Sequence, residues 1–198
     1  MNAYQNFLDF FSMHNKERLD GLSESYFTAM TEEERGSAFN YLLKRVGANG
    51  TEESVNGLFR AAPLRAVATI KQLLKNDSLS GEAQISAAWN LYQEQSDSNL
   101  ISVFVHFLND PDPRLRAKAV YFAPAVLTAE LKAGLQGMIR TETVQLPRIH
   151  AVDKLLACYG VTEESVEPIK YLSIYRDLHN EDSAAKERAF KQLDNFLK

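Results

Sequence analysis

The sequence has little of several residue types that mark specialised classes of protein. Its 198 residues include one cysteine, Cys158, and one tryptophan, Trp89. A single cysteine forms no internal disulfide, which fits a reducing compartment. No apolar run approaches the roughly 18 residues that span a bilayer, and the start, Met1–Gln5, lacks the basic and apolar regions of a secretory signal. We therefore expect a cytoplasmic protein with no membrane partner.

Basic residues are also too few and too scattered to mark a nucleic-acid-binding face. The net charge is −4 and the isoelectric point is near 5.6. Because such a face needs a basic stripe to neutralise phosphates, we expect no direct nucleic-acid binding. Residues 1–100 hold 13 Asp and Glu against 9 Lys and Arg, whereas residues 101–198 hold 13 of each. The acidic half would suit a basic partner, although acidic residues also simply favour helix starts and solubility.

Residues that carry catalysis or bind metals are not grouped along the chain. Four histidines lie on different expected segments without metal-binding spacing: His14, His106, His150 and His179. The glycines of Gly47–Thr51 follow a helix and lack the Lys-Ser/Thr ending of a phosphate-binding loop. Cys158 sits beside apolar residues, which favours a structural thiol. We expect no catalytic residue, no metal and no cofactor.

Apolar periodicity and turn chemistry predict helices along almost the whole chain, and no stretch alternates like a strand. Thr31 and Glu34 have the spacing of a capping box, and they open a helix that we expect to stop at a left-handed Gly47. Proline in a first helical turn predicts starts at Pro63 and Pro113. Further starts are expected at Ser80, Asp97 or Ser98, Thr128, Pro147, Thr162, and Asp182 or Ser183.

Two further expectations concern the buried side of one helix and the start of another. The helix from Pro113 is expected to bury Leu115, Ala119 and Phe122 on one side. The segment begun by Thr162 contains Pro168, which either opens a helix or interrupts one.

A short pattern recurs 34 residues apart. Pro113–Ala117 reads PRLRA, and Pro147–Ala151 reads PRIHA. A period in the thirties with two helices per unit is typical of an α-solenoid, whose repeats bury their apolar faces only by stacking. We predict a single all-α domain over 1–198, of about ten helices in antiparallel pairs. Residues 1–60 would form a divergent N-terminal cap and 61–198 the repeats, with inner helices beginning near 80, 113, 147 and 183.

The segment Asp110–Ala119 resembles the start of the inner helix in HEAT repeats, where an acidic-proline turn precedes an apolar-Arg pair and small residues. The resemblance is good over about 15 residues, partial around Pro147 and weak elsewhere. It implies a ladder between adjacent repeats, here formed by Asp110 or Asp112 with Arg116. His150 replaces the arginine in the next repeat, so any ladder would be short.

One group of bacterial DNA alkylpurine glycosylases also resembles HEAT repeats. Such an enzyme needs a concave face rich in Lys, Arg and aromatic residues to hold a duplex. This chain has one tryptophan, an acidic N-terminal half and isolated basic residues. A glycosylase is therefore a remote alternative to a protein-binding module.

Candidate partner-binding residues lie on the helices assigned to the inner layer. Trp and Tyr are frequent interface anchors, which points to Trp89, Tyr92 and Tyr121, with burial in the core as the alternative for the first two. Three carboxylates fall off the apolar stripes of their helices and should face either solvent or a partner: Glu82, Asp153 and Glu187. His150, which occupies the position of Arg116 in the preceding repeat, completes the candidate set.

The chain also resembles immunity proteins of bacterial polymorphic and contact-dependent growth-inhibition toxins. The features are a small acidic chain, the opening Tyr26–Arg35 before an apolar helix at 39–43, and a degenerate helical repeat. The resemblance implies a monomer that binds a cognate toxin domain 1:1 and covers its active site. Many such toxins are basic nucleases, which carboxylates would complement. The alternative is a HEAT-like scaffold or assembly factor for another cytosolic protein, which needs the same kind of surface.

Overall fold

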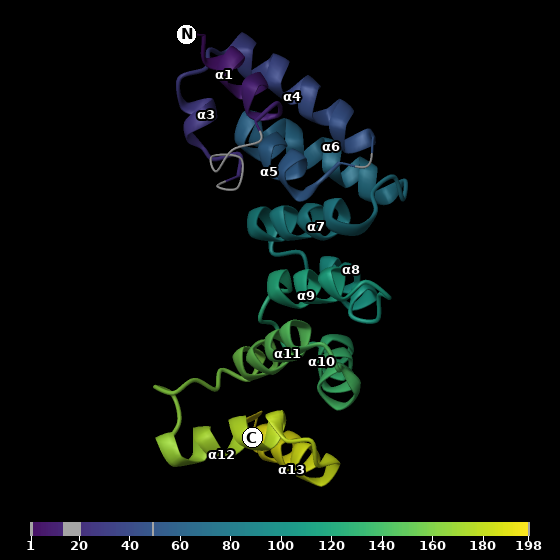
Figure 1. Ribbon diagram of the computed structural model, residues 1–198, viewed down its shortest axis with the longest axis vertical. Coiled ribbons are helices and arrows are strands. Elements are labelled where there is room, and N and C mark those ends of the chain that lie inside the picture. The colour runs from purple at the N-terminus through teal and green to yellow at the C-terminus, as the bar shows by residue number, and fades with distance from the viewer. Residues whose placement is uncertain (1, 14–20, 49, 198) are drawn as a thin grey trace. The chain divides into compact units, whose positions relative to one another are not determined.

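The computed structural model describes residues 2–13, 21–48 and 50–197 of the chain. These residues form twelve α-helices and no strand, so the all-α prediction is confirmed (Figure 1). They belong to two compact units, Met1–Asp97 and Ser98–Lys198. The expected division into a cap over 1–60 and repeats over 61–198 stays a prediction. His14 lies outside the described residues.

The N-terminal unit is built around helix α5, which contacts α4, α6 and α7. Helix α1 packs on α3 and α4. Its helices are α1 (Ala3–Phe10), α3 (Ser25–Thr28), α4 (Glu32–Gly47), α5 (Glu52–Ala61), α6 (Pro63–Lys75) and α7 (Gly81–Gln95).

Aromatic rings fill the contact between α1, α3 and α4. Phe7 is fully buried, and its ring lies within 6 Å of four other rings, at centroid distances of 5.8, 5.3, 5.6 and 5.7 Å. These four rings belong to Tyr4, Phe11, Phe27 and Tyr41. Because such pairs add to the stabilisation from burial itself, they fix a short N-terminal helix that could not stand alone.

In the C-terminal unit, α9, α11 and α12 follow one another on one side, and α8, α10 and α13 on the other (Figure 1). Contacts of α10 with α11 and of α12 with α13 join the two sides. On the first side, α9 packs against its neighbour α11. The elements are η1 (Ser98–Leu100), α8 (Ile101–Phe107), α9 (Pro113–Phe122), α10 (Ala129–Thr141), α11 (Gln145–Cys158), α12 (Pro168–His179), α13 (Ser183–Asp194) and η2 (Asn195–Leu197).

Most predicted helix starts are confirmed in atomic detail. The Thr31 side chain accepts a hydrogen bond from the amide of Glu34, and the Glu34 carboxylate accepts one from the amide of Thr31, as a capping box requires. Pro63 and Pro113 are the first residues of α6 and α9, whereas α11 begins at Gln145, before the expected Pro147. Further side-chain caps form at Thr128 and Asp182.

Two details at helix ends were wrong. Helix α4 does stop at Gly47, but Gly47 has no positive φ, and the C-cap is Ala48, whose amide donates to the main-chain oxygen of Arg45. The segment from Thr162 is a turn, because Thr162 and Ser165 exchange hydrogen bonds with each other's amides. A helix begins only at Pro168, which settles the alternative in favour of an opening proline.

The buried face of α9 also differs from the prediction. Leu115 and Phe122 are half-buried, whereas Ala117, Ala119 and Val120 are the buried residues. Small side chains allow α9 to approach α11 closely, and this contact sets the rotation of the helix. Periodicity favoured the larger residues because it weighs side-chain size and not the closeness of the neighbouring helix.

The order of the last two helices departs from the expected alternation. The helix near residue 183 was expected beside those near 113 and 147. Instead α12 packs against α11, and α13 packs against α10. The segment 159–167 forms no helix, so the chain continues on the α11 side before it crosses over.

No described helix combines the length and the apolar character needed to cross a membrane.

Candidate protein-binding surface

Helices α9 and α11 present an exposed aromatic residue beside an imidazole and a carboxylate. Tyr121, at the end of α9, is 61% exposed. Its ring lies 5.4 Å from the ring of His150 on α11, measured between centroids. Asp153, one turn further along α11, is exposed. The three residues line a hollow of about 320 Å³ together with Lys154 and Ala157. Three of the predicted partner-binding residues therefore meet at one place.

Lys154 fixes the floor of this hollow. Its ammonium group donates hydrogen bonds to the main-chain carbonyls of Tyr121, at 3.0 Å, and Ala123. These carbonyls belong to the end of α9, where the helix leaves acceptors unsatisfied. Burial lowers the pKa of Lys154. The lysine thus locks α11 to the end of α9 and holds the backbone that carries the exposed tyrosine ring.

Helix α12 adds an aromatic stripe that the sequence analysis missed. Tyr171 and Tyr175 stack with centroids 5.9 Å apart, and the His179 ring lies 4.5 Å from Tyr175. Burial raises the pKa of Tyr171, and Asp153 is among the carboxylates that raise it further. Burial lowers the pKa of His179, while Asp153 opposes that shift and Arg148 adds to it. The stripe therefore faces α11. The i, i+4, i+8 spacing of its three rings was the available signal.

We call the set of Tyr121, His150, Asp153, Tyr171, Tyr175 and His179 the α9–α11–α12 surface. Exposed apolar side chains also lie on two of these helices: Leu146 in the first turn of α11, and Ile169 and Leu172 in the first turns of α12. The combination of half-exposed aromatic rings, scattered apolar residues and few charges is typical of the centre of a protein interface.

The other predicted binding residues lie on other helices. Glu187 on α13 forms an ion pair of 2.6 Å with Arg140 on α10, so it lies on the opposite layer of the unit. Glu82, Trp89 and Tyr92 are half-buried on α7 in the N-terminal unit. Sequence reasoning treated them as one face because it assigned all these helices to a single layer.

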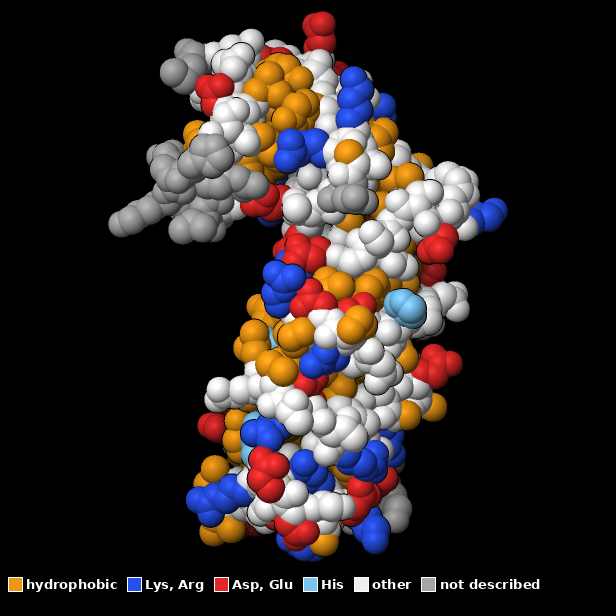
Figure 2. Space-filling view, turned by 45° about the vertical axis from the view of Figure 1, so that its right-hand side comes forward, with side chains coloured by type: hydrophobic (Ala, Val, Ile, Leu, Met, Phe, Trp, Pro, Cys, Tyr) orange, Lys and Arg blue, Asp and Glu red, His pale blue; other side chains and the backbone are white. Residues whose placement is uncertain are grey.

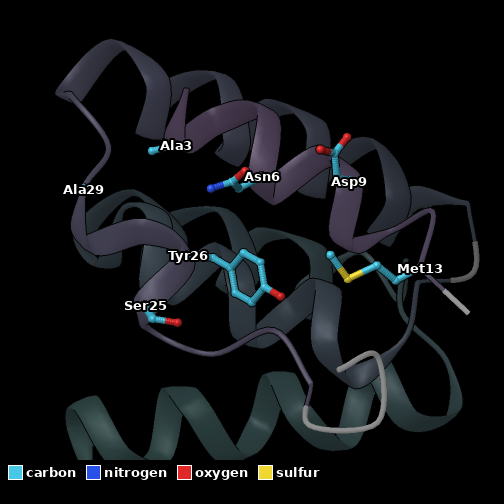
Figure 3. Close-up of a pocket in the computed structure, with 7 residues that line it drawn as sticks. All are labelled: Ala3, Asn6, Asp9, Met13, Ser25, Tyr26 and Ala29. Atoms are coloured by element: carbon cyan, nitrogen blue, oxygen red, sulfur yellow. The ribbon is translucent and has the colours of Figure 1, made fainter. Parts of the chain in front are cut away.

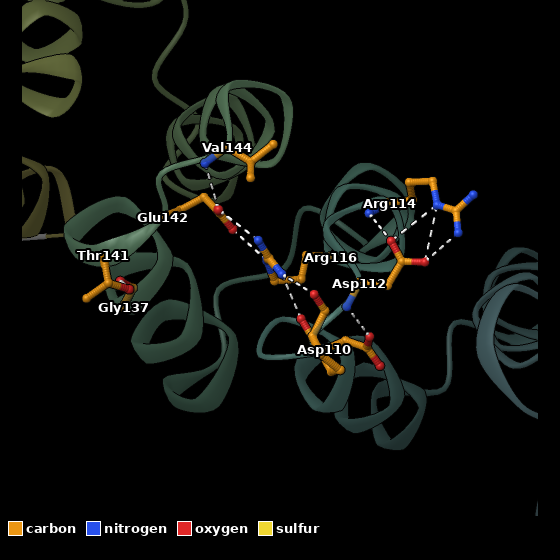
Figure 4. A network of polar contacts seen from close by, with 9 residues as sticks. Asp110, Asp112, Arg114, Arg116, Gly137, Thr141, Glu142 and Val144 are labelled. Atoms are coloured by element: carbon orange, nitrogen blue, oxygen red, sulfur yellow. Dashed lines mark hydrogen bonds and ion pairs between the residues drawn. The ribbon is translucent and has the colours of Figure 1, made fainter.

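The expected ladder residue Arg116 holds a different network (Figure 4). Its guanidinium binds the Glu142 carboxylate through two hydrogen bonds of 2.6 and 2.9 Å, and donates to the main-chain oxygen of Asp110 at 2.8 Å. Glu142 in turn accepts from the amide of Val144. Arg116 therefore ties the turn before α9 to the turn after α10. The Asp112 carboxylate binds Arg114 instead.

A second hollow, of about 500 Å³, lies between α1 and α3 in the N-terminal unit (Figure 3). Asn6 and Asp9 of α1 and Tyr26 of α3 line it. The Asp9 carboxylate already accepts a hydrogen bond from Gln5. With a single carboxylate and no cationic lining residue, this hollow lacks the convergent polar groups of a specific site.

In the part of the chain that the structure describes, no cluster of three or more His, Cys, Asp or Glu residues could hold a metal ion. Burial raises the pKa of Cys158 to about 11, which keeps its thiol protonated at neutral pH. Figure 2 shows basic and acidic side chains intermixed on the visible face of each unit.

Comparison of the chain with protein-family models, with curated proteins and with solved structures finds no match.

Proposed function

We propose that this protein is a non-catalytic binding module built from HEAT-like helical repeats. We further propose that it acts as an immunity protein, using the α9–α11–α12 surface to bind a toxin domain and cover its active site. The observation that carries the proposal is the exposed ring of Tyr121, which lies against the ring of His150 next to the carboxylate of Asp153. The repeat pattern between Pro113 and Pro147 supports the solenoid architecture.

The surface has the physical features of a binding site formed in advance. Lys154 fixes the backbone at Tyr121 through two main-chain carbonyls, so little conformational freedom is lost when a partner covers the ring. A tyrosine offers a large contact area with few rotatable bonds, which suits an anchor. Tyr121 would therefore slow dissociation.

The charges suit a basic partner. Asp153 is exposed in the middle of the surface, and Glu163 lies near enough to Tyr171 to raise the pKa of its phenol. An active site that holds nucleic-acid phosphates is rich in Lys and Arg, and these would meet the two carboxylates. Exposed charges of this kind act mainly on the rate of encounter.

The proposal is tested by co-expression with the toxin domain encoded beside this gene, followed by binding kinetics of the purified pair. The wild-type chain should restore growth. Tyr121→Ala should raise the dissociation rate about 30-fold, as loss of an interface anchor of about 2 kcal/mol requires. Leu64→Ala is the control, because Leu64 is 91% exposed on α6 and is not one of the residues that form the surface. A lack of protection against the neighbouring toxin would reject the immunity function.

A charge variant separates encounter from anchoring. Asp153→Asn should lower the association rate about threefold at low salt and make it less sensitive to salt. Asp77→Asn removes the same charge from an exposed turn of the N-terminal unit and should leave both rates unchanged. If neither Tyr121→Ala nor Asp153→Asn changes binding, another face is the interface. Tight binding to an enzyme of the same operon, without protection, would instead favour the scaffold alternative.

A further inference from the structure

A polar cavity of about 380 Å³ lies in the N-terminal unit, among helices α4, α5 and α7. Arg35 comes from α4, Asn56 and Arg60 from α5, and Trp89 and Asn90 from α7. The sequence analysis singled out only Trp89 of these residues. The cavity shares no residue with the α9–α11–α12 surface.

Two asparagines form a polar floor with unused hydrogen-bonding capacity. Asn56 Oδ1 accepts hydrogen bonds from Ser86 Oγ at 2.8 Å and from Asn90 Nδ2 at 2.7 Å, which occupies both of its lone pairs. Asn90 Nδ2 gives its other hydrogen to the main-chain oxygen of Ser86. Within the described residues, this leaves the amide hydrogens of Asn56 and the Oδ1 of Asn90 for another group.

This arrangement is locked in place. Ser86 is 2% exposed, so its hydroxyl must keep its partner, and the three side chains orient one another. The floor therefore presents a donor next to an acceptor in a fixed orientation. A peptide unit offers the complementary pair, a carbonyl oxygen and an amide hydrogen.

Two arginines form a cationic wall. Arg35 Nη1 donates to the main-chain oxygen of Arg60 at 3.1 Å, and Arg60 Nη1 donates to the main-chain oxygen of Leu22. Each guanidinium has five N–H groups, so these anchoring bonds leave further donors directed elsewhere. The nearby Glu24 carboxylate is 3.9 Å from Arg60 and its side chain is 65% exposed, which makes that ion pair weak. The wall keeps an excess of one positive charge.

We propose that this cavity binds a short peptide segment that carries an aspartate or glutamate side chain. The peptide unit would pair with Asn56 and Asn90, and the carboxylate would bind the guanidinium groups of Arg35 and Arg60. Apolar atoms of the segment would lie against Phe59 and Trp89, which also line the cavity. The cavity volume falls in the range of small-ligand sites. This site is independent of the proposed immunity function.

The chain supplies its own probe, because Trp89 is its only tryptophan. The peptide acetyl-Ala-Glu-Ala-amide is titrated into the full-length protein while tryptophan fluorescence is recorded. A saturable change is expected, and acetyl-Ala-Gln-Ala-amide should bind about tenfold more weakly because its amide lacks the charge. No saturable change up to about 10 mM, the range of the weakest specific sites, would overturn the proposal. Equal affinity for both peptides would overturn the role of the arginines.

Matched variants test whether the peptide binds in this cavity. Arg35→Gln should weaken binding of the Glu peptide about tenfold, whereas Arg65→Gln, the same change on the exposed side of α6, should leave it unchanged. Pro63→Glu offers a second test that spares the anchoring bonds, because Pro63 lines the cavity at the first position of α6, where glutamate is tolerated. The added carboxylate should weaken the Glu peptide about tenfold and the Gln peptide little. Unchanged affinity in both cavity variants would show that the peptide binds elsewhere.

Discussion

Each of the two units is stabilised internally by a different kind of interaction. In the N-terminal unit, the fully buried rings of Phe7, Phe10, Phe27 and Phe39 fill the spaces between helices. In the C-terminal unit, ion pairs join separate elements, and that between Arg116 and Glu142 has side chains only 16% and 5% exposed. Close-packed rings depend on volume, whereas an ion pair depends on protonation. The N-terminal unit should therefore be sensitive to truncation of its core and the C-terminal unit to acid.

The largest effect is expected from removing a ring at the centre of the aromatic cluster. Phe7→Ala should lower the free energy of unfolding by about 3–5 kcal/mol, because it loses buried area and leaves a cavity among four neighbouring rings. Urea unfolding followed by Trp89 fluorescence, which reports the N-terminal unit, measures it. A loss under about 1 kcal/mol would mean that α1 contributes little to this unit.

The next effect tests the polar ties of the C-terminal unit with two matched glutamates. Glu142→Gln should cost about 2–4 kcal/mol, because it leaves the guanidinium of Arg116 buried without its charged partner. Glu187→Gln breaks an ion pair of the same length with Arg140, but the Glu187 side chain is 45% exposed, so the cost should be much smaller than that of Glu142→Gln. Urea midpoints followed by circular dichroism compare the two. Equal costs would show that burial does not set the strength of these pairs.

Lowering the pH should remove the stabilisation from the Arg116–Glu142 ion pair without a mutation. The hydrogen bonds from Arg116 hold the pKa of Glu142 below its ordinary value. The ion pair therefore stabilises the fold fully above the pKa of an unfolded glutamate, about 4.3, and its contribution is lost as the pH falls through the lower pKa of the folded state. The difference in unfolding free energy between wild type and Glu142→Gln should be constant from pH 7 to about pH 5 and shrink below pH 4. A difference that persists at low pH would contradict this account.

The smallest effects concern a feature that the two units share. Gly57 on α5 and Gly134 on α10 each lie where a Cβ atom would meet a leucine side chain at 2.8 and 2.5 Å. Alanine at either site should destabilise by about 1 kcal/mol, despite its better helix propensity. Gly36→Ala and Gly137→Ala are the controls, because nothing lies within 4 Å of their added methyl groups. Those two should stabilise by about 0.5–1 kcal/mol, as thermal unfolding would show.

Local chemistry made the helix boundaries predictable, and distant contacts limited the rest. Thr31, Glu34, Pro63 and Pro113 act within one helical turn, so the sequence alone identifies them. The rotation of α9 depends on how closely α11 approaches, which explains the error at Leu115. The packing of α12 and α13 depends on the path of the chain through 159–167, and no local sequence pattern predicts that path.

The candidate surface was predicted in part for the same reason. Tyr121 lies on α9, and His150 and Asp153 lie on α11, the two helices that carry the pattern repeated 34 residues apart, so the repeat brought them together. Glu187 was placed beside them only by extending that period through 159–167, where no helix forms. Tyr171 and Tyr175 were missed because α12 was not expected in this layer.

The hydrogen bonds of Lys154 have a consequence for how this protein could evolve. The side chains that a partner would read, Tyr121, His150 and Asp153, project from helices without forming the core, so a lineage that meets a new partner could exchange them one at a time. Lys154 lies among them yet satisfies two carbonyls of the fold. We expect related sequences to vary at the three surface positions while retaining lysine at 154, so that recognition diversifies around an invariant scaffold residue.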